Sequence, residues 1–173
     1  MRKAVFLAAA LWFLSAAAGC GTAPAAVSPA AAAPGYAVGD RAAAFQLTDL
    51  AGKKIALSHH EPTLLYFMAA WCSSCWAGEE HLAALYPRFA HQIRFVSLDV
   101  TPGQDTPAAL AQVQKRYGGP WPHAFAPAGL VTAYGVTSLD TAILVGADGR
   151  ILGRWVSPTP QVLAAALAAA VHR

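Results

Sequence analysis

Two cysteines separated by two residues are the most reactive feature of the sequence, in the run Trp71-Cys72-Ser73-Ser74-Cys75. Thiols at this spacing can form a disulfide, be reduced again and exchange with disulfides of other molecules. A disulfide that closes so short a loop removes little chain entropy from the unfolded state, so it is poorly suited to stapling a fold. The pattern therefore favours redox chemistry over a structural disulfide.

The surroundings of the pair give the two cysteines different roles. A continuous apolar run at 64–68 predicts a strand buried on both faces, and a helical pattern follows the cysteines. Cys72 then lies at a helix N-terminus, where free amides and the helix dipole stabilise a thiolate. We expect Cys72 to attack substrates and Cys75, one turn into the helix and facing the core, to resolve the mixed disulfide. Trp71 is a supporting residue of this site.

Zinc is the main alternative use of two cysteines at this spacing. A structural zinc site needs four ligands, and the sequence has no second cysteine pair. We therefore expect no metal and no cofactor, and we expect the histidines to be solvated surface residues. The six are scattered along the chain: His59, His60, His81, His91, His123 and His172.

Short apolar runs alternate with helical patterns, which indicates an α/β fold. Strands are predicted at 45–47, 53–57, 64–68, 93–98, 141–145 and 150–155, of which the last two form a hairpin. Helices are predicted after the cysteines, at 106–117 and at 160–171. Pro87 should kink or end the first helix, because it has no backbone N–H to donate.

The first 20 residues differ in character from the rest. Arg2 and Lys3 precede an apolar stretch, 4–18, that would reach about 22 Å as a helix, short of the roughly 30 Å of a membrane core. A charged start, a short apolar run and small residues indicate an export signal at 1–20. An uncleaved anchor helix is the alternative.

The end of this leader, Ala17-Ala18-Gly19-Cys20, resembles the bacterial lipobox, whose cysteine is acylated and becomes the mature N-terminus. The large aliphatic residue usual at its first position is Ala17 here. We assign Cys20 as the lipidation site, since two or three acyl chains anchor a protein stably to a membrane. Cleavage without lipidation is the alternative. The Ala/Pro-rich stretch 21–35 predicts a linker that reaches roughly 45 Å when extended, before a single domain at 36–173.

Charge excludes one class of partner. The formal net charge is +3, and removal of the leader with Arg2 and Lys3 leaves it near neutrality. Without a basic face, the chain is not expected to bind nucleic acid. We expect a monomer.

Later segments carry a family resemblance. The strand, the WCxxC motif and the helix, followed by AYGV at 133–136, DTAILV at 140–145 and ADGRI at 147–151, resemble the TlpA/ResA-like branch of membrane-tethered thioredoxin-like proteins. The resemblance covers residue 36 to the C-terminus. It implies a thioredoxin-like α/β fold, with a central mixed sheet flanked by helices and an extra N-terminal hairpin.

The resemblance also implies an activity and a place in the cell. It implies thiol–disulfide exchange, chiefly reduction, with exported protein disulfides or thiols, and a membrane thiol carrier as electron donor. The expected location is the bacterial cell envelope, facing the periplasm or the outside of the cytoplasmic membrane.

Three positions depart from the family pattern. Asp140 stands where the family has a cis-proline that faces the cysteines, so we expect a trans bond before it and a role for its carboxylate beside the disulfide. The carboxylate that the family often carries three residues after the second cysteine is Gly78 here, followed by Glu79. Tyr66 replaces the acid that thioredoxin buries six residues before the first cysteine. Asp140 or Glu79 is thus the candidate proton acceptor, although Asp140 as a turn residue and Glu79 as a solvated helix residue remain alternatives.

Two other functions fit parts of the sequence. Sco-like copper delivery shares the fold, the tether and the missing proline, but it spaces its cysteines by three residues and adds a histidine ligand. A carboxylate at position 140 is a poor ligand for copper(I). Peroxidases of the peroxiredoxin type place a threonine three residues before the reactive cysteine, where this chain has Ala69.

Overall fold

The computed structural model describes residues 34–172. The predicted export signal, Cys20 and the linker up to residue 33 lie outside the described residues. Within the described range, no helix is long and apolar enough to cross a membrane.

A five-stranded mixed sheet forms the centre of the domain, with the strand order β5-β4-β3-β6-β7. The middle strand, β3 (Thr63–Met68), runs parallel to β4 (Arg94–Asp99) and antiparallel to β6 (Thr141–Val145). The edges are β5 (His123–Phe125), parallel to β4, and β7 (Ile151–Val156), which forms the predicted hairpin with β6. The predicted mixed sheet is confirmed.

The apolar run of β3 explains its central place. All six of its residues are buried, and successive side chains point to opposite faces of the sheet. Leu64, Tyr66 and Met68 belong to one hydrophobic core, while Leu65 and Phe67 belong to a second core on the other face. A strand that divides two cores needs apolar side chains on both faces, as the sequence predicted.

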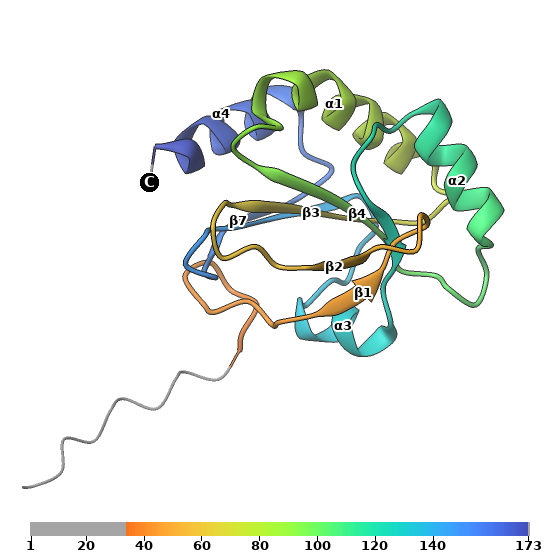
Figure 1. The fold of residues 1–173 in the computed structure, drawn as a ribbon, viewed down its shortest axis with the longest axis horizontal. Helices are drawn as coiled ribbons and strands as arrows, with labels where there is room; N and C mark the ends of the chain where they lie inside the picture. Colours follow the sequence, from red (N-terminus) through yellow and green to blue (C-terminus); the bar gives the residue numbers. More distant parts are fainter. Residues whose placement is uncertain (1–33, 173) are drawn as a thin grey trace, which may run out of the picture. The chain divides into compact units, whose positions relative to one another are not determined.

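Helices cover the sheet unequally (Figure 1). The first core lies under α1 (Ser73–Phe89), α2 (Pro107–Arg116) and α4 (Pro160–Val171). The second core is closed by α3 (Ala128–Ala133) and by the N-terminal hairpin. Pro87 lies inside α1, which continues for only two residues beyond it.

The N-terminal hairpin pairs β1 (Gln46–Thr48) with β2 (Lys54–Ala56). Asp49 Oδ1 closes its turn by accepting hydrogen bonds from the backbone N–H groups of Ala51 and Lys53, at 2.9 and 2.8 Å. The extra hairpin that the family resemblance implied is therefore confirmed.

Two elements, β5 and α3, were not predicted. Strand β5 has three residues, and its pairing with the end of β4, rather than an apolar pattern of its own, makes it a strand. Helix α3 has only six residues and begins after Pro127 without a side-chain cap. Both elements depend on tertiary contacts that local sequence patterns do not encode. The other predicted strands and helices are confirmed within one to two residues at their ends.

Candidate active site

Strand β3 and helix α1 position the cysteine pair. After Met68 the chain makes a turn in which Cys72 N donates to the carbonyl of Ala69 at 3.1 Å, and α1 begins at the next residue. Cys72 is thus the N-cap of the helix, with extended backbone angles, and Cys75 lies one turn in. The two cysteines form a disulfide, with their Cα atoms 5.2 Å apart. This is the arrangement that the sequence predicted.

The two sulfur atoms have different surroundings. Cys75 is fully buried, whereas Cys72 retains 7% of its surface and follows Trp71, which is 57% exposed. Cys72 Sγ accepts a hydrogen bond from the backbone N–H of Cys75 at 3.2 Å and lies 3.3 Å from the hydroxyl of Ser74. Donors of this kind at a helix N-terminus stabilise negative charge on sulfur. The geometry therefore suits Cys72 for attack and Cys75 for resolution.

A pair of aspartates holds the loop before Cys72. The backbone N–H of Ala70 lies 3.1 Å from Asp99 Oδ2 and 2.9 Å from Asp105 Oδ2. The indole N–H of Trp76 donates to the carbonyl of the same residue at 2.8 Å. Hydrogen bonds therefore hold both the backbone N–H and the carbonyl oxygen of Ala70 in place, two residues before the candidate nucleophile Cys72.

The pKa of Asp99 departs from the ordinary value of an aspartate. Burial, strengthened by the hydrogen bond and charge of Asp105, raises the pKa of Asp99 to about 6, against the opposing effect of hydrogen bonds from Thr101. Sequence reasoning missed this residue. The available signal was an acidic residue directly after the predicted strand 93–98. In the structure, Asp99 pairs in register with Met68 at the end of β3.

Asp140 lies against the first turns of α1 and not on the surface. Its carboxylate is buried, and Oδ1 accepts a hydrogen bond of 2.7 Å from the hydroxyl of Tyr66. The same hydroxyl lies 3.1 Å from the carbonyl oxygen of Cys75. No peptide bond among residues 34–172 is cis, so the expected trans bond before Asp140 is confirmed, and the residue has a positive φ of 57°.

The hydroxyl of Tyr66 is a permanent donor to this carboxylate. Burial is the main reason that the pKa of Tyr66 is raised far above its ordinary value, and the hydrogen bond and charge of Asp140, followed by the charge of Glu79, raise it further. The phenol therefore keeps its proton at any pH at which proteins remain folded.

Gly78 makes room for this contact. A Cβ atom at position 78 would clash with the hydroxyl of Tyr66 and would lie 2.9 Å from Asp140 Oδ1. The three departures from the family pattern thus form one local structure. The space beside Gly78 is taken by a tyrosine hydroxyl and by a carboxylate from position 140.

Glu79 and His123 form a second polar group in the core, and the prediction that His123 is a solvated surface residue was wrong. Glu79 is fully buried and not solvated, and His123 is 1% exposed and not a surface residue. Glu79 Oε1 lies 3.2 Å from His123 Nε2. Sequence reasoning missed the partner because His123 lies on the unpredicted strand β5. Glu79 itself follows Cys75 by four residues, which places both on one face of α1.

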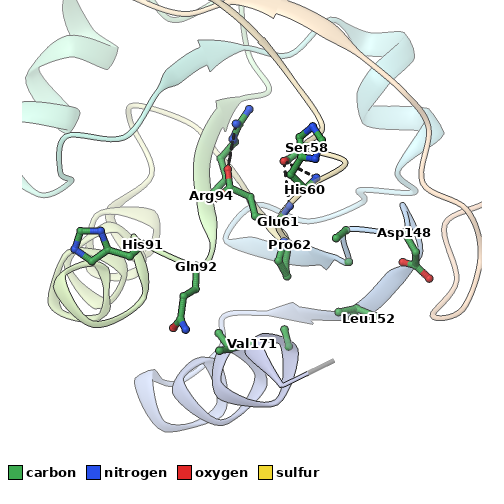
Figure 2. A pocket seen from close by; sticks show the side chains of 13 residues that line it. Ser58, His60, Glu61, Pro62, His91, Gln92, Arg94, Asp148, Leu152 and Val171 are labelled. Carbon is green, nitrogen blue, oxygen red and sulfur yellow. Dashed lines mark hydrogen bonds and ion pairs between the residues drawn. The ribbon is translucent and has the colours of Figure 1, made fainter.

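A large cavity lies elsewhere (Figure 2). It measures about 780 Å³ and its lining includes Pro62, directly before β3, and Glu61 and Arg94, whose side chains form an ion pair of 3.1 Å. Strand β3 starts beside this cavity and ends four residues before Cys72. The cavity therefore belongs to the end of the sheet opposite the cysteines, which are not among its lining residues.

Comparison with known proteins agrees with this geometry. A model of the AhpC/TSA family matches residues 38–153. Thiol-disulfide oxidoreductase ResA of Bacillus thuringiensis subsp. konkukian is 30% identical over 119 residues, which are 66% of this chain and 67% of that protein.

Solved structures share the fold. A thioredoxin-like protein from Aeropyrum pernix has a TM-score of 0.65 and 25% identity, and the match covers 73% of this chain and 89% of that one. A thiol:disulfide interchange protein of the thioredoxin family from Chlorobium tepidum has a TM-score of 0.66 and 20% identity, over 82% and 99% of the two chains. The predicted thioredoxin-like fold and the ResA-like resemblance are confirmed. The chain belongs to the AhpC/TSA family, with a thioredoxin-like fold and the cysteine pair of a thiol–disulfide oxidoreductase.

Proposed function

We propose that this protein is an exported, lipid-anchored disulfide reductase that exchanges electrons with exported proteins through Cys72 and Cys75. One observation carries the proposal. The two cysteines are joined across the first turn of α1, and only the one at the helix N-terminus has any exposed surface.

The exchange proceeds in two steps. The Cys72 thiolate attacks one sulfur of a substrate disulfide, a mixed disulfide forms, and the other substrate sulfur leaves as a thiolate that takes a proton from water. Cys75 then loses its proton and attacks Cys72 Sγ, which releases the second substrate thiol. The protein pair is oxidised by two electrons and the substrate disulfide is reduced by the same two. Electrons from a membrane thiol carrier restore the dithiol.

Neighbouring residues support these steps. Trp71 offers an exposed aromatic surface next to Cys72 on which a substrate segment can pack. The hydroxyl of Tyr66 holds the Asp140 carboxylate near the backbone of Cys75. From there the carboxylate influences how readily the thiols of Cys72 and Cys75 lose their protons. The carboxylate of Asp140 is already engaged by that hydroxyl, which argues against its use as a copper ligand in a Sco-like role.

The N-terminal sequence supports export and anchoring. A charged start, a short apolar stretch and the lipobox-like Ala17–Cys20 precede an extended linker, and lipid on Cys20 would leave Cys72 and Cys75 as the only thiols. The linker lets the domain reach exported substrates and a membrane donor from a fixed anchor.

One cellular experiment tests anchoring and exchange together. In cells grown with labelled palmitate, we expect the wild type to carry label and to fractionate with membranes, and Cys20→Ala to lose both properties. Cys75→Ser should accumulate disulfide-linked adducts with exported proteins, because its mixed disulfides cannot be resolved. Cys72→Ser, the matched control, should form none, because the attacking thiol is absent.

The outcomes separate the parts of the proposal. Equal palmitate label in the wild type and in Cys20→Ala would contradict lipidation at Cys20. Equal adduct yields from Cys75→Ser and Cys72→Ser would contradict the assignment of Cys72 as the attacking residue.

A further inference from the structure

Asp99 and Asp105 are two carboxylates that the exchange steps leave unexplained, and both approach one backbone group. Ala70 has a single N–H, which lies 3.1 Å from Asp99 Oδ2 and 2.9 Å from Asp105 Oδ2. Asp99 ends β4 and is fully buried, while Asp105 comes from the loop before α2 and is half-buried. Two ionised carboxylates on one donor repel each other, so this arrangement needs an explanation.

A count of the protons identifies the state of the pair. The hydroxyl of Thr101 has one proton, yet its Oγ1 lies 3.0 Å from Asp99 Oδ1 and 2.7 Å from Asp105 Oδ2. The backbone N–H of Thr101 donates to Asp99 Oδ1 at 2.8 Å. Ala70 and Thr101 thus supply three protons for five close contacts with the two carboxylates. One further proton, shared between the two aspartates, relieves this shortage and removes one of the two negative charges.

The surroundings of the pair favour Asp99 as the residue that carries this proton. Its neighbours in the sheet, Met68 of β3 and Phe125 of β5, are uncharged. Burial, with the hydrogen bond and charge of Asp105, raises the pKa of Asp99 to about 6. Asp105 directly precedes Thr106, the N-cap of α2, where the helix dipole stabilises a negative charge. The pair is therefore singly charged below this pH and doubly charged above it.

The N–H that the pair holds belongs to the turn that presents Cys72. Ala70 lies two residues before Cys72, and the indole N–H of Trp76 holds the carbonyl oxygen of Ala70 at 2.8 Å. The ring of Trp76 stacks on the ring of Tyr117, the C-cap of α2, with centroids 5.2 Å apart. One side of the turn is thus fixed by packed aromatic rings, while the other side depends on the two carboxylates.

The helices packed around the pair bring no charge that would offset it. The first turns of α1 and α2 contain no acidic residue, and the basic residues of α2, Lys115 and Arg116, lie in its last turn. On α1 the titratable groups beyond Ala70 are the thiols of Cys72 and Cys75. Within residues 34–172, no basic side chain forms an ion pair with either aspartate. A second negative charge on the pair therefore acts on the Cys72 thiolate.

We propose that Asp99 and Asp105 are positioning residues for Cys72: they hold the preceding turn through a shared proton, and attack by the cysteine slows when that proton is lost to water. The inference rests on the proposed exchange through Cys72 and Cys75. Loss of the proton leaves two ionised carboxylates competing for one N–H, and the half-buried Asp105 can then turn to solvent. The second negative charge also disfavours the Cys72 thiolate. Both effects lower the rate of attack.

The pH profile of Cys72 alkylation tests this role. In the full chain with Cys20→Ala and Cys75→Ser, the uncharged reagent iodoacetamide reacts only with Cys72. Asp105→Asn in this parent keeps the side-chain shape and replaces the shared proton with a permanent amide N–H. We expect the variant and its parent to react within about twofold of each other at about pH 5, and Asp105→Asn to react about threefold faster at about pH 7.5.

Asp148→Asn is the matched control, because Asp148 is an exposed carboxylate beside the cavity at the opposite end of the sheet. It should match its parent at both pH values. A ratio of the Asp105→Asn rate to the parent rate that does not change with pH would overturn the proposal. In contrast, a reduced wild type that does not attack the disulfide of dithiobis-nitrobenzoate would overturn the exchange itself.

A measurement on the wild type covers the case in which Asp105→Asn does not fold. In proton and nitrogen-15 spectra, we expect the backbone amide of Ala70 to shift with a midpoint near pH 6, as the pair loses its proton. The amide of Ala109, which donates to the hydroxyl of Thr106 at 3.1 Å, should not shift with it. An Ala70 amide that is as insensitive to pH as that of Ala109 would overturn the shared proton.

Discussion

Tyr66→Phe is expected to lower the free energy of unfolding by about 2–3 kcal/mol at pH 7, because it strands a buried carboxylate. The hydroxyl of Tyr66 is the only hydrogen-bond donor to the Asp140 side chain among residues 34–172. The ring itself remains, so the loss reports the missing hydrogen bond and little else.

A double-mutant cycle checks this account. Asp140→Asn removes the charge, so Tyr66→Phe should cost less in that background than in the wild type, with a coupling of about 1–2 kcal/mol. Urea unfolding of the four proteins at pH 7 measures it. Additive effects of the two substitutions would contradict an Asp140 carboxylate that is held by the hydroxyl of Tyr66.

Gly78→Ala should destabilise the protein by about 2–4 kcal/mol, although helix propensity alone predicts a gain of about 1 kcal/mol. The added methyl group would clash with the hydroxyl of Tyr66. That side chain is fully buried and bonded to Asp140, so it can retreat only by breaking this contact. The steric and hydrogen-bond costs therefore exceed the gain in propensity.

Gly129→Ala provides the matched control. Gly129 also lies in a helix, α3, but it is exposed and an added Cβ would have no neighbour within 4 Å. We expect it to be neutral or stabilising by up to about 1 kcal/mol in urea unfolding. A Gly78→Ala variant as stable as Gly129→Ala would show that the space beside Tyr66 is not filled as described.

The sequence predicted those parts of the site that local patterns encode. The apolar run of β3, the start of α1 and the spacing of Cys72 and Cys75 all lie within a dozen residues, and the structure confirms their arrangement. Family resemblance also drew attention to position 140. Local patterns could not supply its partner, because Tyr66 and Asp140 are 74 residues apart in sequence.

The same limit explains the residues that were missed. Asp99 holds Ala70 across 29 residues, and His123 meets Glu79 only because β5 pairs with β4. Glu79 was named as a candidate from the sequence, and helical spacing places it on the same buried face as Cys75 and Leu82. Its charge favoured the alternative of a solvated helix residue, because only a partner on another element makes the burial of a carboxylate acceptable.

The reduction potential of the Cys72/Cys75 couple tests the central claim most directly, because a reductase must hold its electrons at a potential below that of the disulfides it opens. Equilibration of the protein with glutathione or dithiothreitol buffers, followed by alkylation of free thiols, measures it. We predict a value between about −300 and −220 mV, in the range of thioredoxin and the glutaredoxins. A value near about −120 mV, typical of strong protein oxidants, would contradict a reductase and make the protein a disulfide donor.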